Sequence, residues 1–236
     1  MNASVSTISN LSLALAFVPA LIVIAIMYYW RAGGGTAVYA TLRMLAQLLL
    51  IGYVLIYIFD ADHWGIIAGV LVVMLVAASW IAVRTVVSPG PRTYMLAFFA
   101  ISVSGIPILA LVTQVVIDVE PWFKPRYVVP LAGMIFSGSM TSISIAAERL
   151  ASELQSGRSW TDARRKAFDA AMIPIVNSLF AVGLVSLPGM MTGQVLSGVS
   201  PLIAAKYQIV VMTMLFGAAG IAAALYLAFE KTEHCS

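Results

Sequence analysis

The sequence predicts an all-α integral membrane protein, a bundle of about seven transmembrane helices with a broken segment after Pro188. Hydrophobic residues make up 61% of the chain and charged residues only 10%, whereas an average soluble domain is about a quarter charged. The mean hydropathy is +0.99. Apolar stretches of about twenty residues, enough to cross a hydrocarbon core of about 30 Å, recur from one end of the chain to the other. A water-soluble fold is therefore excluded.

Seven apolar stretches are expected to span the membrane as one transmembrane domain over residues 1–236. No basic residue precedes the first stretch, since the first in the chain is Arg31. A cleaved signal peptide needs a positively charged start, so we expect this stretch to be retained. An odd number of spans places the two termini on opposite sides. The expected spans are 11–30, 37–59, 64–83, 94–117, 127–147, 172–187 and 207–229.

Lysine and arginine are concentrated in alternate linkers between these spans. Such cations accumulate on the cytoplasmic side of a membrane. We therefore expect a multi-pass protein of the cell membrane (inner or plasma membrane), with its N-terminus outside and its C-terminus in the cytoplasm. The net charge of +3 follows from this topology and predicts contact with the lipid bilayer, with no nucleic-acid partner. The cations that decide the orientation are Arg31, Arg84, Arg92, Arg149, Arg158, Arg164, Arg165, Lys166 and Lys231.

The second expected span carries two polar residues, Arg43 and Gln47, which we expect to form a buried polar pair. They are one helical turn apart and therefore share a face of the helix. Arg43 lies close to the inner boundary of the span, where a long cationic side chain extends to the headgroups. Snorkelling or a structural ion pair is favoured over contact with a transported solute.

Residues 148–171 form the one sizeable cytoplasmic excursion that the sequence predicts. Two helical segments are expected there, separated by Ser156 and Gly157. Its basic run has two interpretations that the sequence leaves open: a solvated or headgroup-facing surface, or a docking helix for a soluble partner. The candidate docking residues are Arg158, Asp162, Arg164, Arg165 and Lys166.

Residues 183–194, GLVSLPGMMTGQ, interrupt the last two apolar stretches. Pro188 removes a backbone donor, so the chain must leave the helix there. Irregular backbone at membrane depth is stable only inside protein or beside a wet cavity. A tight outer loop is one interpretation, and a transport pathway built on discontinuous helices is the other. The pathway candidates are Asn177, Met190, Met191, Thr192 and Gln194.

Methionine is the remaining chemical signal in and around this segment. Thioether ligands favour Cu(I) over harder cations. Flexible packing explains methionines of this kind better than ligation does. No metal site is assigned from the sequence.

Three parts of the chain resemble one family of membrane proteins. Residues 183–212, the segment 130–134 (PLAGM) and the pair Arg43 and Gln47 are similar to the Fet-type iron-export permeases. These are membrane subunits of a small ABC-transporter family whose plant relatives are linked to aluminium tolerance. The resemblance implies a homodimeric permease that exports iron or a related metal or metal-linked solute, with ATP bound by a cytoplasmic ABC ATPase subunit.

Three function classes follow from these observations. No Gly-x-x-x-x-Gly-Lys-Ser/Thr loop is present, so an ABC permease would bind no cofactor itself and depend on a separate ATPase. The alternative is a stand-alone secondary carrier or channel, although the acidic residue that such proteins hold deep in a span is missing. An enzyme is least favoured, because both histidines lie outside the expected spans and no intramembrane catalytic pair can form.

Overall fold

The computed structural model describes residues 9–60, 63–86 and 90–230; Lys231 lies outside these ranges. The regular structure of the described part is helical, which confirms the predicted all-α membrane fold. The chain divides into two compact units, Met1–Asp60 and Ala61–Ser236, and each is described by itself. The single transmembrane domain over residues 1–236 stays a prediction.

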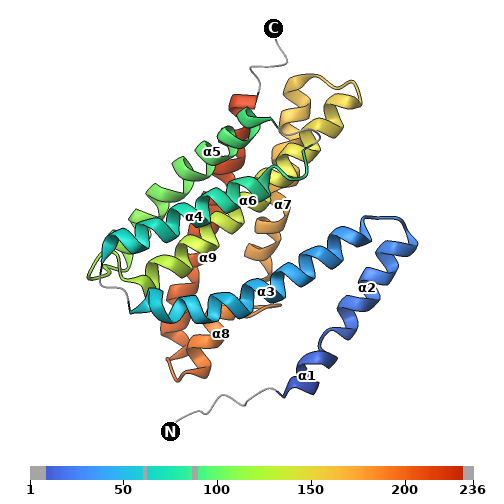
Figure 1. Cartoon of the computed structure of the whole chain (residues 1–236). Helices are drawn as coiled ribbons and strands as arrows, with labels where there is room; N and C mark the ends of the chain where they lie inside the picture. Colours follow the sequence, from blue (N-terminus) through green and yellow to red (C-terminus); the bar gives the residue numbers. More distant parts are fainter. Residues whose placement is uncertain (1–8, 61–62, 87–89, 231–236) are drawn as a thin grey trace. The chain divides into compact units, whose positions relative to one another are not determined.

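Unit 1 is a helical hairpin preceded by one short helix (blue in Figure 1). Ser9 caps the short helix, because its Oγ accepts a hydrogen bond from the backbone N–H of Ser12 at 3.1 Å. The turn of the hairpin needs left-handed backbone at Arg31 (φ 54°) and at Gly33 (φ 76°). Glycine adopts this conformation without steric cost. The helices are α1 (Asn10–Leu15), α2 (Val18–Tyr29) and α3 (Gly34–Phe59).

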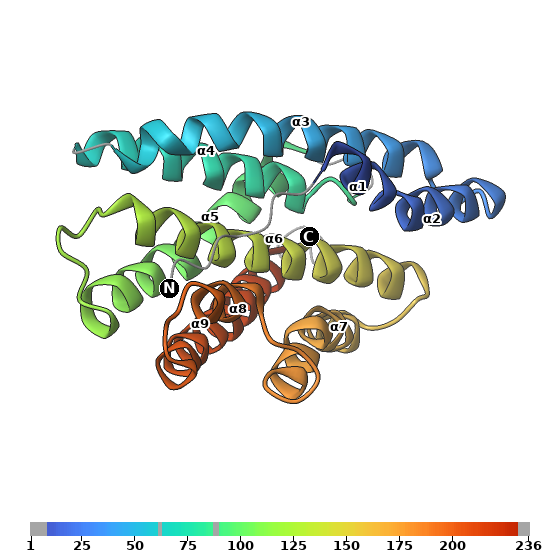
Figure 2. The ribbon, with the colours of Figure 1, turned by 90° about the horizontal axis from the view of Figure 1, so that it is seen from below.

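Unit 2 is a bundle built around one long central helix. Its elements are α4 (Trp64–Ala82), α5 (Pro91–Ala110), the π-helix η1 (Leu111–Val116), α6 (Pro125–Gln155), α7 (Trp160–Ala181), α8 (Gly189–Leu196) and α9 (Pro201–Phe229). The central helix α6 packs against α4, α5, α7 and α9 (Figures 1 and 2). Small side chains fill these contacts: Ala132, Ala146 and Ala222 are fully buried. Small residues let helices in a membrane approach closely, which explains the tight bundle.

α5 lies close against α6 at Gly105. A Cβ atom at this position would lie 2.9 Å from Ile135 Cγ2 and 3.0 Å from Phe136 Cε1. Two residues later, Pro107 interrupts the hydrogen bonding of α5. The helix then continues as η1, in which the turns are wider. Glycine is therefore required at residue 105 if α5 is to keep this place beside the central helix.

Six helices in the described ranges are long and apolar enough to cross a membrane. They match six of the seven expected spans. The remaining stretch, residues 172–187, forms the second half of α7 and the turn that follows it. α7 is not one of the six because charged side chains fill its first half. These are Asp162, Arg164, Arg165, Lys166 and Asp169.

The predicted break in the last third of the chain is present, and it begins earlier than Pro188. α7 ends at Ala181, and Gly183 turns the chain with a φ of 84°. Pro188 is the N-cap of α8, a place where a missing backbone N–H costs no helical hydrogen bond. The proline therefore starts a helix here. α8 packs against α9, and Figure 2 shows it beside the first part of that helix.

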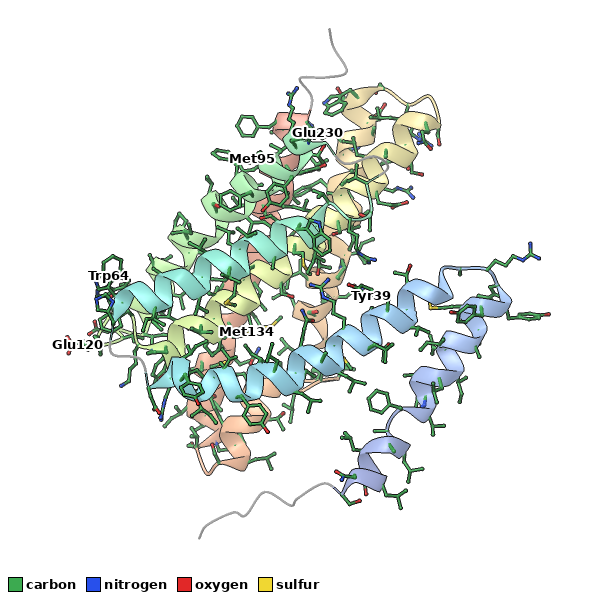
Figure 3. All side chains as sticks on the ribbon, viewed as in Figure 1. Tyr39, Trp64, Met95, Glu120, Met134 and Glu230 are labelled. Carbon is green, nitrogen blue, oxygen red and sulfur yellow. The ribbon has the colours of Figure 1, made fainter. Side chains whose placement is uncertain are left out.

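The two ends of unit 2 differ in how many Lys and Arg residues they carry. Trp64 and Glu120 mark one end, and Met95 and Glu230 lie toward the other (Figure 3). We call the second the basic end, after its cations. α4, α6 and α9 finish there, and α5 and α7 begin there. Its cations are Arg84, Arg92, Arg149, Arg158, Arg164, Arg165 and Lys166. The opposite end carries Lys124, Arg126 and Lys206 together with Asp118 and Glu120.

Candidate functional site

The predicted cytoplasmic excursion folds as a helical hairpin between α6 and α7 at the basic end (the α6–α7 hairpin, residues 148–171). Gly157 makes the turn with a φ of 75°. Ser159 starts α7, because its Oγ accepts a hydrogen bond from the backbone N–H of Asp162 at 3.2 Å. The acidic side chain in the first turn also suits the positive end of the helix dipole. The hairpin is therefore a defined structure with its own caps.

A single buried carboxylate holds the two helices of this hairpin together. Only 7% of the Glu153 side chain is exposed. Arg149 on α6 and Arg158 in the turn each place a guanidinium nitrogen 2.5 Å from its oxygens, and Lys166 Nζ on α7 lies 3.6 Å away. A buried carboxylate is stable only when it is paired. Glu153 therefore links α6, the turn and α7 in one charged cluster.

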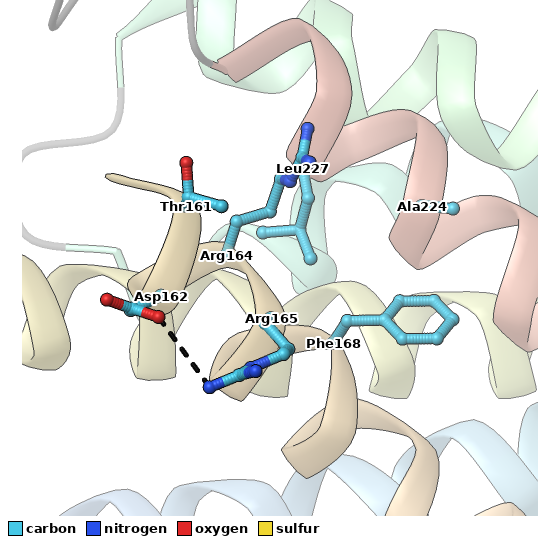
Figure 4. A pocket seen from close by; sticks show the side chains of 7 residues that line it. All are labelled: Thr161, Asp162, Arg164, Arg165, Phe168, Ala224 and Leu227. Atoms are coloured by element: carbon cyan, nitrogen blue, oxygen red, sulfur yellow. Dashed lines mark ion pairs between the residues drawn. The ribbon is translucent and has the colours of Figure 1, made fainter. Parts of the chain in front are cut away.

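A cavity of about 510 Å³ lies between α7 and α9 at the basic end (the α7–α9 groove). Its lining is polar on one side and apolar on the other. In Figure 4, Arg164 lies beside Leu227, and Arg165 extends away from it toward Asp162. The guanidinium of Arg165 is 3.6 Å from the carboxylate of Asp162. The lining residues are Thr161, Asp162, Arg164, Arg165, Phe168, Ala224 and Leu227.

The structure separates the predicted docking residues into two groups. Arg158 and Lys166 belong to the Glu153 cluster. Asp162, Arg164 and Arg165 line the α7–α9 groove. The first group therefore stabilises the hairpin, whereas the second presents charge to whatever enters the groove.

Two further cavities, of about 190 and 500 Å³, adjoin the middle of α6 and share Ser137, Gly138 and Leu215. The polar groups on their lining side chains are hydroxyls, and Met134 adds a thioether. No ionisable side chain lines either cavity in the described part of the chain. The hydroxyl-bearing residues are Ser137, Thr141, Ser142 and Ser178.

The predicted pathway residues lie on α7 and α8. Asn177 is exposed on α7, and the other four are half-buried on α8. The structure does not place any of the five in the lining of the cavities beside α6. Gln194 is notable among them, since its Oε1 is buried and accepts no hydrogen bond within the described residues. The same holds for Oε1 of Gln208 on α9. The four residues on α8 are Met190, Met191, Thr192 and Gln194.

Arg43 and Gln47 lie one turn apart on α3 in unit 1, as expected. Arg43 is half-buried, and Gln47 is exposed. Among the described residues, no group of three or more His, Cys, Asp and Glu side chains is placed to hold a metal ion. Arg43 and Gln47 thus place two polar side chains, one turn apart, on an otherwise apolar helix.

Residues 8–233 match the family described as "Uncharacterised protein family (UPF0014)". The chain belongs to the UPF0014 family. No solved structure matches it.

Several UPF0014 relatives carry names of their own. The chain is 36% identical to the UPF0014 membrane protein slr1647 of Synechocystis over 77% of its own length and 76% of the relative. It is 34% identical to the probable iron export permease protein FetB of Escherichia coli over 95% and 92% of the two chains. It is 30% identical to the protein ALUMINUM SENSITIVE 3 of Arabidopsis thaliana over 79% and 72%. The family resemblance read from residues 183–212 is thereby confirmed, and so is the multi-pass membrane character.

Sequence reasoning missed one residue of this UPF0014 chain that pairs with three cations, Glu153. A carboxylate at the end of an apolar helix looks like an ordinary boundary residue. One signal was available: Arg149 and Glu153 are four residues apart, the spacing of a helical ion pair. The contribution of Lys166, thirteen positions later, depends on how the hairpin folds, and no local pattern reveals it.

Proposed function

We propose that this chain is the membrane-spanning permease subunit of an ABC-type transporter that exports iron or a related metal or metal-linked solute. A separate cytoplasmic ATPase binds the ATP. The proposal is supported by the 34% identity to a relative named as a probable iron export permease. It includes a homodimer, which the resemblance to ABC permeases implies.

The α6–α7 hairpin is the observation that carries the proposal. A permease driven by a separate ATPase needs a rigid element that receives force in the cytoplasm and passes it into the membrane. The hairpin projects from α6, the helix that contacts most of the bundle. Because Glu153 ties it to α7, a push on the hairpin turn moves two helices together. Arg158, Asp162, Arg164, Arg165 and Lys166 are the proposed contact region.

The proposed orientation places the basic end of unit 2 in the cytoplasm. Seven described cations gather at this end and three at the opposite end, while acidic side chains lie at both. Cytoplasmic accumulation of Lys and Arg then sets the C-terminus of α9 inside. The ATPase would meet the α6–α7 hairpin in this arrangement.

The proposed pathway uses the interrupted region between α7 and α9. Asn177, Met190, Met191, Thr192 and Gln194 lie there, and the buried Oε1 of Gln194 is left without a hydrogen bond. A carboxamide oxygen of this kind is costly unless a solute or water satisfies it. Helices that end inside a bundle are the usual place for such groups in transporters.

A stand-alone secondary carrier or channel, the alternative left by the sequence, has less support. Such proteins couple transport to a proton or cation through an acidic residue deep in a span. The described carboxylates nearest to that position are Glu148 on α6 and Asp169 on α7, and both lie within residues 148–171. They belong to the hairpin and not to the membrane centre.

The experiment that tests the proposal is cross-linking in native membranes, with the single cysteine, Cys235, replaced by serine. Two matched cysteine variants are available, Ser156→Cys and Ser197→Cys. Both serines are exposed C-cap residues, of α6 and α8 respectively, at opposite ends of unit 2. We expect Ser156→Cys to cross-link to an ATP-binding subunit and Ser197→Cys not to do so. Cross-links from neither position, in membranes that contain the ATPase, would contradict docking at the hairpin.

A further inference from the structure

The α7–α9 groove lies where hydrocarbon gives way to headgroups. The charged half of α7 ends at Asp169, and no ionisable residue follows up to Ala181. At 1.5 Å per residue, Arg164 lies about 8 Å beyond Asp169 along the helix. The polar layer on each side of a bilayer is about 5–7 Å thick. The backbone of Arg164 therefore lies at the outer edge of this layer, where its long side chain reaches the lipid phosphates.

The apolar side of the groove lies at the edge of the hydrocarbon. Ala224 and Leu227 belong to the last turns of α9, before its first acidic or basic residue at this end, Glu230. Phe168 comes from the turn of α7 that precedes the uncharged half. The groove thus presents cations at headgroup depth and apolar side chains directly below them. A phospholipid has the matching order of parts, an anionic headgroup above apolar acyl chains.

The charges of the groove are available to a ligand. Arg164 forms no salt bridge with any described residue. Arg165 pairs with Asp162 at 3.6 Å, but the two side chains are 72% and 54% exposed. Exposed pairs of this kind contribute little, so an incoming anion can take over the guanidinium. Arginine also suits phosphate, because its planar fork donates two hydrogen bonds at once.

We propose that the α7–α9 groove binds an anionic phospholipid from the leaflet at the basic end. Arg164 and Arg165 hold the phosphate, and Thr161 offers a hydroxyl beside them. Phe168 and Leu227 contact the glycerol and the first part of the acyl chains. The volume of about 510 Å³ is within the usual range of about 300–1,000 Å³ for small-ligand sites. Basic pockets between transmembrane helices are known to take such headgroups.

The apolar residues of the groove favour a lipid over a protein partner. A segment of a cytoplasmic protein would have to reach below the headgroups to cover Leu227 and Ala224, whereas a lipid already lies there. The site shares Arg164 and Arg165 with the proposed ATPase contact region, so the bound lipid would lie between that contact and the membrane. It differs from the transport proposal in what it needs. It requires only a membrane with an anionic lipid, and neither an ATPase nor a transported solute.

The test measures lipid selection by the purified chain alone. The chain is placed in vesicles of phosphatidylcholine with a minor fraction of phosphatidylglycerol, and the retained lipid is identified by native mass spectrometry. We expect phosphatidylglycerol to be enriched in the wild type. Arg164→Gln should reduce the enrichment about fivefold, the effect of one interfacial cation. Ala224→Trp should reduce it as well, because the indole fills the groove without changing the charge.

Arg84→Gln is the matched control. Arg84 is an exposed cation of the basic end that does not line the groove, so its loss should change the enrichment less than twofold. Equal losses from Arg84→Gln and Arg164→Gln would overturn the proposal in favour of diffuse charge attraction. Displacement of the lipid by millimolar inorganic phosphate would assign the groove to a soluble anion. Absence of enrichment, together with a cross-link from Thr161→Cys to the ATPase, would make it a protein contact.

Discussion

The Nζ atom of Lys166 lies 3.6 Å from Oε2 of Glu153, so a salt bridge joins α7 to the last turns of α6. The same carboxylate pairs with Arg149 and Arg158. Three cations around one buried acid make this contact the main polar link between the two helices. The α6–α7 hairpin is therefore expected to move as one body.

Removal of the Glu153 charge tests this link. Glu153→Gln leaves the cations with an uncharged partner, and the free energy of unfolding should fall by about 1.5–3 kcal/mol, the usual range for hydrogen bonds to charged groups. Thermal unfolding in detergent provides the measurement. Glu148→Gln is the control, because Glu148 is an exposed acid on the same helix, and a surface change of this kind shifts stability by less than about 0.5 kcal/mol. Equal effects of the two variants would refute the special position of Glu153.

The packing of α5 on α6 gives a second prediction. Gly105→Ala places a methyl group 2.9 Å from Ile135 Cγ2, and overpacking of this kind costs about 1–3 kcal/mol. Gly138→Ala is the matched control, since its Cβ would meet Leu215 Cδ2 at an ordinary 3.5 Å. We expect a lower unfolding temperature for the first variant alone. If Gly105→Ala is as stable as the wild type, the close contact is incorrect.

Solvent access along α8 tests the proposed pathway. Cysteines placed singly at Met190, Thr192 and Gln194, with Cys235 replaced by serine, should react with a small water-soluble thiol reagent. The rates should change when the ATPase is trapped with nucleotide, because alternating access alters exposure. We expect the largest change at Gln194. Leu196→Cys is the control, because this side chain is 68% exposed and should not respond to nucleotide. Constant rates at all three positions would remove α8 from the mechanism.

Membrane topology provides a fourth prediction. With the N-terminus outside and the C-terminus inside, a reporter that fluoresces only in the cytoplasm should be bright after Ser236. It should be dark when it is inserted at Asp62. Cellular fluorescence at matched expression gives the answer, and equal brightness at the two sites is incompatible with the orientation.

The sequence predicted the helical membrane class and most of the spans because these depend on composition and length. The predicted boundaries were less accurate for α7, where a charged half and an apolar half form one continuous helix. A search for uniform apolar stretches divides such a helix in two. Pro188 illustrates a related difficulty, since the same residue ends one helix or begins the next according to its neighbours.

The candidate sites depended more on tertiary structure. The basic run 164–166 was visible in the sequence. The sequence did not reveal that Lys166 pairs with Glu153 while Arg164 lines the α7–α9 groove. Leu227 contributes to this groove from the end of α9, about sixty positions away in the chain. Contacts of that separation leave no periodic pattern, so the groove became recognisable only in the folded bundle.

The most direct test of the central claim is transport in reconstituted vesicles. The purified chain is incorporated with and without its ATPase, and the movement of radiolabelled iron is followed with and without ATP. The permease proposal predicts transport that requires both ATP and the ATPase, and that is weakened by Glu153→Gln. Equal iron movement by the chain alone, unaffected by ATP, would contradict it and favour a stand-alone carrier or channel.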